Sequence, residues 1–132
     1  MKFKNLTIIL LIFIIPILAY FLLSNSEKGI ADKTDNGDKP QIIKFTSLMC
    51  LDCKKLGKVM KEVYPDYSDD ITLIEIQVQN NDDYTKEMID TYNINLVPTI
   101  IILDEKGKQL NKIEGFIEKK KLEQIMKDLT NE

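Results

Sequence analysis

Residues 41–63 read QIIKFTSLMCLDCKKLGKVMKEV, and this stretch decides the fold. Its first six residues, 41–46, are a short run of strand-forming residues. The residues that follow show an apolar pattern with helical spacing, formed by Leu56, Val59, Met60 and Val63 and stopped by Pro65. The only two cysteines of the chain, Cys50 and Cys53, lie between these patterns. The stretch therefore predicts a strand that leads into a helix, with a CxxC pair where the helix begins.

The remaining residues continue to alternate between strand and helix patterns. Residues 71–78 are rich in β-branched side chains and predict a second strand, and residues 82–92 carry apolar side chains at helical spacing. Residues 99–103 precede a turn sequence, DEKG, after which residues 108–115 can return as a hairpin partner. Residues 118–129 predict an amphipathic helix. The order βαβαββα predicts an α/β fold with a central mixed β-sheet and helices on both faces.

Length and composition limit the possible functions. The chain has 132 residues, of which roughly ninety remain for one small domain after an apolar N-terminus and a polar stretch. With 18 basic and 21 acidic residues the net charge is -3, so we expect no nucleic-acid partner. Histidine is absent, which excludes Ser-His and Cys-His nucleophile pairs and His-containing zinc sites. The side chains that remain available for chemistry are carboxylates, lysines, tyrosines and two cysteines. We expect the protein to be a monomer.

The N-terminal residues predict a membrane segment. Lys2 and Lys4 precede an apolar run over residues 6–23, which is long enough to cross a bilayer. A cleavable signal has a shorter apolar centre, so we expect residues 1–23 to be a single-pass transmembrane helix, with a removed signal as the alternative. The lysines favour a cytoplasmic N-terminus, which places the rest of the chain on the extracytoplasmic side of the cell membrane. Residues 24–39 are polar and predict a flexible linker to a domain at residues 40–132.

The position of the cysteine pair indicates redox chemistry. Unpaired amides and the positive end of the helix dipole favour a thiolate at Cys50, and the three-residue spacing lets Cys53 attack a mixed disulfide. Cys50 is therefore the expected nucleophile and Cys53 the resolving thiol, with their disulfide in place of a cofactor. A structural disulfide is the alternative, but so short a loop constrains little of the unfolded chain. A metal site needs further ligands, and we expect no bound metal.

Over residues 40–130 the sequence resembles the thioredoxin family. The resemblance rests on the strand end Phe45-Thr46-Ser47, on Cys50 to Cys53 with Lys54 after them, on Tyr92 and on Val97-Pro98-Thr99. It implies a thioredoxin-like fold in which Pro98 is cis and lies against the cysteines, and in which the backbone of Val97 pairs with an extended substrate. Gly115-Phe116 is similar to the Gly-Phe of the C-terminal thioredoxin-like domain of transmembrane disulfide reductases, which favours an extracytoplasmic relative.

Several positions depart from the family pattern around the cysteines. Met49 replaces the usual Trp, Leu51 and Asp52 replace the usual Gly-Pro, and Leu96 replaces a frequent Gly. We expect a substrate-contact surface around Cys50, formed by Met49, Leu51, Asp52, Leu96, Val97, Pro98 and Thr99. The negative charge of Asp52 disfavours a thiolate beside it and so favours a reductant over a strongly oxidising centre.

Two charged residues also differ from the family pattern. Lys44 lies six residues before Cys50, where thioredoxins carry a buried Asp, and Glu75 falls where the family has the Lys that faces this Asp. We expect a Lys44–Glu75 ion pair beneath the cysteines, because an unpaired buried lysine is costly. Glu75 would then be the carboxylate that exchanges a proton with Cys53. In the alternative, the alkyl chain of Lys44 is buried while its ammonium group extends to water, and Glu75 is a solvent-facing strand residue.

Together these features predict a thiol-disulfide oxidoreductase that reduces disulfides of extracytoplasmic proteins. The anchor would hold the domain near a membrane-embedded electron donor, and a role in cytochrome maturation or in repair of wrong disulfides fits the resemblance. A disulfide-forming oxidase is the alternative enzyme. A non-catalytic membrane-tethered interaction domain and a metal-delivery protein are alternatives of other classes.

Overall fold

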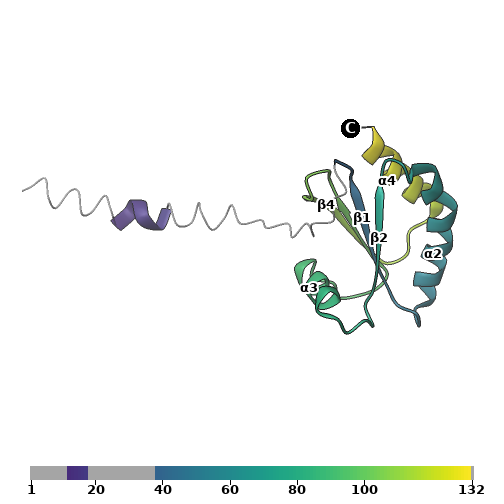
Figure 1. The fold of residues 1–132 in the computed structure, drawn as a ribbon, viewed down its shortest axis with the longest axis horizontal. Helices are drawn as coiled ribbons and strands as arrows, with labels where there is room; N and C mark the ends of the chain where they lie inside the picture. Colours follow the sequence, from purple (N-terminus) through teal and green to yellow (C-terminus); the bar gives the residue numbers. More distant parts are fainter. Residues whose placement is uncertain (1–11, 18–37, 132) are drawn as a thin grey trace, which may run out of the picture.

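The structure is a computed structural model that describes residues 12–17 and 38–131 (Figure 1). Its elements in the domain are β1 (Gln41–Thr46), α2 (Leu51–Val63), the 3-10 helix η1 (Tyr64–Tyr67), β2 (Thr72–Gln77), α3 (Asp83–Thr91), β3 (Thr99–Leu103), β4 (Gln109–Glu114) and α4 (Lys119–Thr130). The predicted order βαβαββα is confirmed. The element that was not predicted is η1, a 3-10 helix with Pro65 in its first turn. Proline suits this position because its φ is fixed near the helical value and its missing N–H would have no partner there.

The four strands form one mixed sheet in the order β2-β1-β3-β4. β1 pairs with β2 in parallel and with β3 in antiparallel orientation, and β3 and β4 form the antiparallel hairpin. The parallel register places Lys44 opposite Glu75. β1 is therefore central, whereas β2 is an edge strand among the described residues.

Helices cover both faces of the sheet, as the alternation of side chains along the central strands requires. Ile42 on β1 packs with α2 and α4, in a cluster that includes Leu56, Met60 and Leu122. Phe45 faces the opposite side, in a cluster completed by Met88 of α3, by Tyr92 at the C-cap of α3, and by Ile101 and Leu103 of β3. β3 is buried over its whole length. Each fully buried side chain of this kind stabilises by about 1.5–3 kcal/mol. The first cluster therefore holds α2 against β1, and the second holds α3 against the opposite face of the sheet.

A side-chain cap defines the start of α3. The carboxylate of Asp82 accepts hydrogen bonds from the backbone N–H of Thr85 at 2.8 Å and from its hydroxyl at 2.9 Å. The backbone hydrogen bond from Thr85 is the main reason why the pKa of Asp82 lies below its ordinary value. The connection from β2 therefore enters α3 at a defined residue. After α3, the backbone N–H groups of Asn93 and Ile94 donate to carbonyl oxygens of the helix, which ties the start of the loop before Pro98 to α3.

Residues 12–17 are helical. Most of the predicted anchor and linker, residues 1–11 and 18–37, lies outside the described residues. Within the described ranges, no helix is both long and apolar enough to span a bilayer. The transmembrane helix stays a prediction from the sequence.

Candidate active site

Cys50 and Cys53 form a disulfide where α2 begins. Cys50 has extended backbone angles and is the N-cap of the helix, and its sulfur accepts a hydrogen bond from the backbone N–H of Cys53 at 3.0 Å. That N–H is one of the unpaired donors at a helix start, so it is available to stabilise a thiolate on Cys50. Cys53 is 3% exposed, whereas Cys50 is half-buried. An incoming thiol or disulfide therefore reaches Cys50 first.

The loop that carries Pro98 lies against the disulfide. The Val97–Pro98 peptide bond is cis, as the resemblance implies, and Pro98 is fully buried. The carbonyl oxygen of Val97 lies 3.7 Å from the Cys50 sulfur, so it can accept a hydrogen bond from the Cys50 thiol once the disulfide is reduced. Thr99 is buried and donates its hydroxyl to the carbonyl oxygen of Leu96 at 2.7 Å, which closes the loop around the proline.

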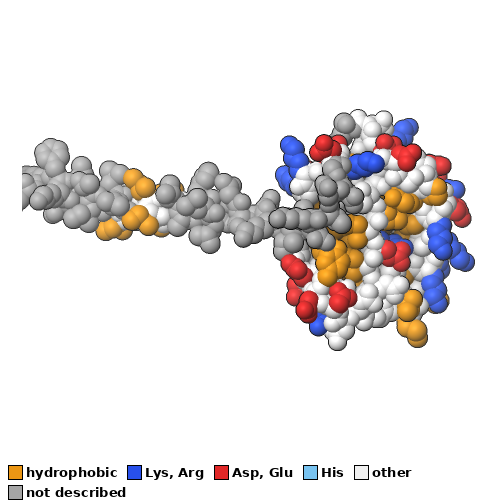
Figure 2. Space-filling model, viewed as in Figure 1, with side chains coloured by type: hydrophobic (Ala, Val, Ile, Leu, Met, Phe, Trp, Pro, Cys, Tyr) orange, Lys and Arg blue, Asp and Glu red, His pale blue; other side chains and the backbone are white. Residues whose placement is uncertain are grey.

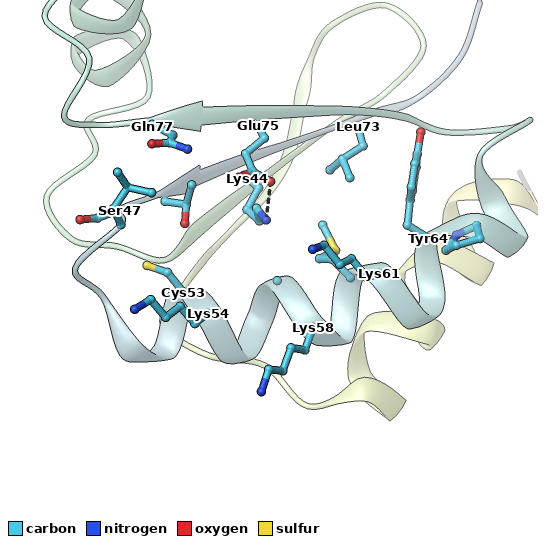
Figure 3. A pocket seen from close by; sticks show the side chains of 15 residues that line it. Lys44, Ser47, Cys53, Lys54, Lys58, Lys61, Tyr64, Leu73, Glu75 and Gln77 are labelled. Carbon is cyan, nitrogen blue, oxygen red and sulfur yellow. Dashed lines mark ion pairs between the residues drawn. The ribbon is translucent and has the colours of Figure 1, made fainter.

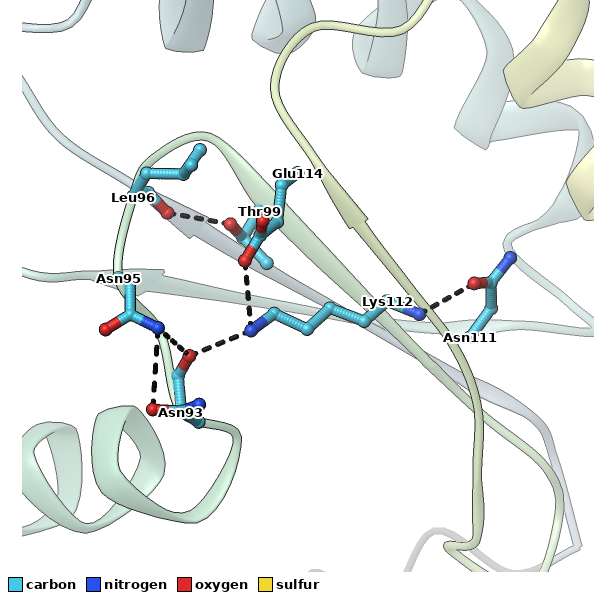
Figure 4. Close-up of polar contacts among 7 residues, drawn as sticks. All are labelled: Asn93, Asn95, Leu96, Thr99, Asn111, Lys112 and Glu114. Carbon is cyan, nitrogen blue, oxygen red and sulfur yellow. Dashed lines mark hydrogen bonds and ion pairs between the residues drawn. The ribbon is translucent and has the colours of Figure 1, made fainter.

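Lys112 on β4 connects this loop to the sheet, as Figure 4 shows. Its ammonium group donates to the carbonyl oxygen of Asn93 at 2.8 Å and pairs with Glu114 at 3.0 Å. Asn93 has a φ of 50°, in the left-handed region that Asn tolerates better than most residues. The backbone N–H of Gly115 donates to the carbonyl oxygen of Pro98 at 2.7 Å. The loop that contains Val97 and Pro98 is therefore held by Lys112 of β4, through Asn93, and by Gly115 just after β4, through Pro98.

Exposed apolar side chains flank Cys50. Met49 is 90% exposed and Leu51 is 73% exposed, on either side of Cys50. Leu96 is 45% exposed in the Pro98 loop, which contacts the same cysteine through Val97. Solvent exposure of three large apolar residues near one reactive sulfur is typical of a contact surface. Leu48, at 62% exposure, extends this surface beyond the residues predicted from the sequence.

Asp52 lies on the outer side of the first turn of α2. Its carboxylate is 55% exposed and pairs with Lys55 at 3.0 Å, one turn along the helix. Exposed pairs of this kind are screened by water and contribute little. The negative charge that the sequence places between the cysteines is therefore partly offset by its neighbour.

The structure brings Lys44 and Glu75 together. The Lys44 ammonium lies 2.6 Å from the Glu75 carboxylate, with the lysine side chain 6% exposed and the glutamate side chain 48% exposed. The ion pair predicted from the sequence is thus present, but its carboxylate is half in water because β2 is an edge strand. α2 passes close to the lysine at Gly57, where an added Cβ would lie 3.9 Å from the ammonium nitrogen.

Lys44, Glu75 and Cys53 line one groove of about 600 Å³ between β2 and α2 (Figure 3). Cys53 lies at the end of the groove that is closest to the start of α2, and the ion pair lies further along it. The buried sulfur of the disulfide and a half-exposed carboxylate therefore share one cavity. Such an arrangement can pass a proton between Cys53 and solvent.

Comparison with known proteins identifies the family. The sequence model of the family described as Thioredoxin matches residues 23–128, which is most of the chain. The chain belongs to the thioredoxin family. A thioredoxin of Mycoplasmoides gallisepticum is 30% identical over 102 residues, which cover 77% of this chain and 96% of that protein. The thiol-disulfide oxidoreductase ResA of Bacillus thuringiensis subsp. konkukian is 25% identical over 129 residues, which cover 83% of this chain and 75% of that protein.

Solved structures agree with the family assignment at the level of the fold. The thioredoxin of Malassezia sympodialis superposes with a TM-score of 0.61 at 20% identity, over 71% of this chain and 77% of that one. A thioredoxin-fold protein from Helicobacter pylori gives a TM-score of 0.65 at 18% identity, over 71% of this chain and 70% of that one. Thioredoxin-family membership, oxidoreductase relatives and the CxxC disulfide together make this protein a thioredoxin-like thiol-disulfide oxidoreductase.

Two parts of this thioredoxin-family site were not predicted from the sequence. Gly57 had no distinguishing signal within the helical pattern; it lines the groove, and a Cβ there would make an ordinary contact with the Lys44 ammonium at 3.9 Å. Lys112 and Glu114 are two residues apart on a predicted strand, which is enough to place them on one face. Their contact with Asn93 depends on how the loop before Pro98 folds back, and no pattern in the sequence shows this.

Proposed function

We propose that this protein is a membrane-tethered reductase of disulfides in extracytoplasmic proteins. The observation that carries the proposal is the asymmetry of the disulfide: Cys50 is accessible and Cys53 is 3% exposed. This is the asymmetry that a nucleophile and a resolving thiol require. The negative charge of Asp52 supports reduction over oxidation. The similarity to ResA, a thiol-disulfide oxidoreductase, supports the exchange chemistry.

The reaction proposed for the reduced protein is a pair of thiol-disulfide exchanges. The Cys50 thiolate attacks one sulfur of the substrate disulfide, which forms a mixed disulfide and releases one substrate sulfur as a thiolate that takes up a proton. Cys53 then loses its proton and attacks the Cys50 sulfur, which forms the Cys50–Cys53 disulfide and releases the second substrate thiol. Two electrons and two protons from a donor, proposed to be membrane-embedded, restore the dithiol. No further cofactor is needed.

Glu75 is the proposed acceptor of the Cys53 proton, with Lys44 holding its carboxylate in place. Support comes from the groove that Cys53 and Glu75 share and from the 2.6 Å contact with Lys44. The rate of disulfide exchange in Glu75→Gln, measured between pH 5 and pH 9 on the full chain, tests this role. A pH profile identical to that of the wild type would remove Glu75 from the mechanism.

The proposed substrate surface consists of Met49, Leu51 and Leu96 around Cys50, together with the backbone at Val97, with Asp52, Pro98 and Thr99 at its border. Exposure of the three apolar side chains and the 3.7 Å approach of the Val97 carbonyl to Cys50 support it. The apolar run at residues 6–23 is the proposed anchor, and a monomer is the proposed state. The lysines before that run support an extracytoplasmic domain.

The reduction potential of the full chain, measured by thiol labelling in defined redox buffers, tests the direction of electron flow. A value near the thioredoxin figure of about -270 mV supports the reductase, whereas a value near about -120 mV indicates an oxidase. A disulfide that resists reduction in all buffers would be a structural disulfide, and this result would refute the proposed redox role of Cys50 and Cys53.

Trapping identifies the substrates. Cys53→Ala removes the resolving thiol, so mixed disulfides with Cys50 accumulate, and the matched control Cys50→Ala with Cys53→Ala should capture nothing. Labelling of Cys50 in intact cells with a membrane-impermeant maleimide tests the location of the domain. Absence of labelling until the membrane is permeabilised would contradict it.

A further inference from the structure

The groove between β2 and α2 extends well beyond the disulfide. It follows α2 from Ser47 and Cys53 at one end to Tyr64 and Pro65 at the other (Figure 3). The proposed proton transfer uses only the part that contains Cys53 and the Lys44–Glu75 pair. The remainder, lined by apolar side chains such as Leu73 and by lysines of α2, has no assigned use. In the space-filling view of Figure 2, positive side chains gather over α2.

One wall of the groove is β2, which is an edge strand within the part of the chain that the structure describes and has outward-facing backbone groups. The backbone N–H of Thr72 donates to Pro40 and that of Val78 donates to Thr46, both at 3.0 Å. In a parallel ladder alternate residues bond to the same neighbour, so the N–H groups of Leu73, Glu75 and Gln77 face away from β1. Side chains of the same three residues line the groove. An edge of this kind is a template for another strand.

The opposite wall is positively charged. Lys54, Lys58 and Lys61 recur at helical spacing along α2 and line the groove together with Lys44. Among the described residues that line the groove, Glu75 is the one carboxylate, and it is already paired with Lys44. The chain as a whole carries a net charge of -3, so this concentration of positive charge is local. Charge complementarity therefore favours an anionic occupant.

The spacings of the two walls fit an extended chain. The three lysines follow one another at steps of four and three residues, which correspond to rises of about 6 Å and 4.5 Å along the helix. Alternate side chains of a β-strand recur about every 6.8 Å. A strand paired with β2 can thus direct every second side chain towards the lysines, whose long stems absorb the remaining difference.

We propose that the groove binds an extended acidic segment of the protein substrate, which pairs its backbone with the edge of β2 and places its carboxylates against Lys54, Lys58 and Lys61. The inference rests on the proposed function, because the groove ends at Ser47 and Cys53, beside the reactive disulfide. Strand addition supplies backbone hydrogen bonds, and the lysines select for charge. The substrate class is therefore proteins with an acidic extended segment near the disulfide.

Two synthetic peptides test the groove directly. The first is a decapeptide of alternating Val and Glu, and the second has Lys in place of Glu. We expect the acidic peptide to slow hydrogen exchange of the Leu73, Glu75 and Gln77 amides about tenfold or more in the isotope-labelled, oxidised full chain in detergent micelles. The amides of Ile74 and Ile76, which face β1, should not change. The Lys peptide should leave all five amides unchanged.

Charge reversal tests the lysine wall. The double variant Lys58→Glu with Lys61→Glu should weaken binding of the acidic peptide about tenfold, measured by fluorescence anisotropy at low salt. The matched control reverses two exposed lysines of α4, Lys120 and Lys127, which are not among the groove residues, and should keep wild-type affinity. Neither pair is part of the proposed reaction, so both variants should reduce 2-hydroxyethyl disulfide, a small neutral substrate, at the wild-type rate.

Three results would overturn the inference. The acidic peptide fails to bind at millimolar concentration, the Lys peptide binds equally well, or the three outward amides are already protected in the free protein because the chain itself occupies the edge. Each outcome is independent of the redox measurement, so the groove can fail while the reductase stands. A disulfide that resists reduction would instead refute the reductase without changing the binding result.

Discussion

Replacing Glu75 by glutamine tests the energetics of the ion pair. The Lys44 side chain is 6% exposed and its ammonium lies 2.6 Å from the Glu75 carboxylate, so glutamine leaves a nearly buried charge without its counter-charge. Removal of one member of a fully buried pair costs about 3–5 kcal/mol, and an exposed pair contributes about 0–1 kcal/mol. Because Glu75 is 48% exposed, water replaces part of its effect. We expect Glu75→Gln to lower the free energy of unfolding by about 1.5–2.5 kcal/mol.

The matched variant is Lys44→Met, which removes the buried charge and fills the same space with an apolar chain. The carboxylate that it leaves unpaired is half in water, so we expect this variant to lose less than about 1 kcal/mol. The double variant should resemble Lys44→Met, because glutamine costs little once the buried ammonium is gone.

Urea unfolding of the oxidised full chain measures these differences. With a slope of about 1–1.5 kcal/mol per molar urea for a domain of this size, Glu75→Gln should lower the midpoint by about 1–2.5 M. Equal midpoints for Glu75→Gln and Lys44→Met would refute the reasoning, since the predicted asymmetry comes only from the difference in burial. An unchanged midpoint in Glu75→Gln would refute it as well.

Four further variants test other parts of the molecule. The pKa of Asp82 in the folded protein is lower than its ordinary value of 3.8. The ionised carboxylate therefore contributes stability above pH 3.8, and this contribution is lost as the pH falls through the pKa of the folded protein. The urea midpoints of Asp82→Ala and wild type should accordingly converge in acid. Burial raises the pKa of Tyr92 above its ordinary value of 10.0, so wild-type stability should fall above that pH, and Tyr92→Phe should remove this loss in urea titrations. Lys112→Met should raise KM for a protein disulfide about fivefold and leave the reduction potential unchanged, with rescue by Lys112→Arg, because the lysine holds the Pro98 loop. Asp52→Asn should make the potential more oxidising by less than about 30 mV in redox-buffer titrations, since Lys55 already offsets part of the charge.

The order of elements could be predicted because each has a local pattern. β1 and β3 are short apolar runs between polar segments, and α4 has an amphipathic repeat whose inward residues Leu122 and Met126 are fully buried. The start of α2 at the cysteines could be predicted because the strand-forming run ends at residue 46 and the apolar pattern with helical spacing begins after it. These predictions depend on neighbours in the sequence, which is why they held to within a residue at most ends.

Contacts between distant segments were harder to predict. The Lys44–Glu75 pair required a parallel register between β1 and β2, and the resemblance to a known family supplied it. The half-exposure of Glu75 depends on β2 lying at the edge of the sheet, which the order of elements along the chain does not determine. The link from Lys112 to Asn93 spans 19 residues and depends on the path of a loop.

The distribution of the two charges between a central and an edge strand has a chemical consequence. Lys44 lies between Glu75 on β2 and Ile100 on β3, so its counter-charge comes from β2. The carboxylate therefore contacts the buried ammonium on one side and water on the other, while it shares a groove with Cys53. With the charges reversed, the carboxylate would lie on the buried strand and the ammonium in water. The arrangement found here puts the proposed proton acceptor where a proton taken from Cys53 can pass to solvent without a rearrangement of the sheet.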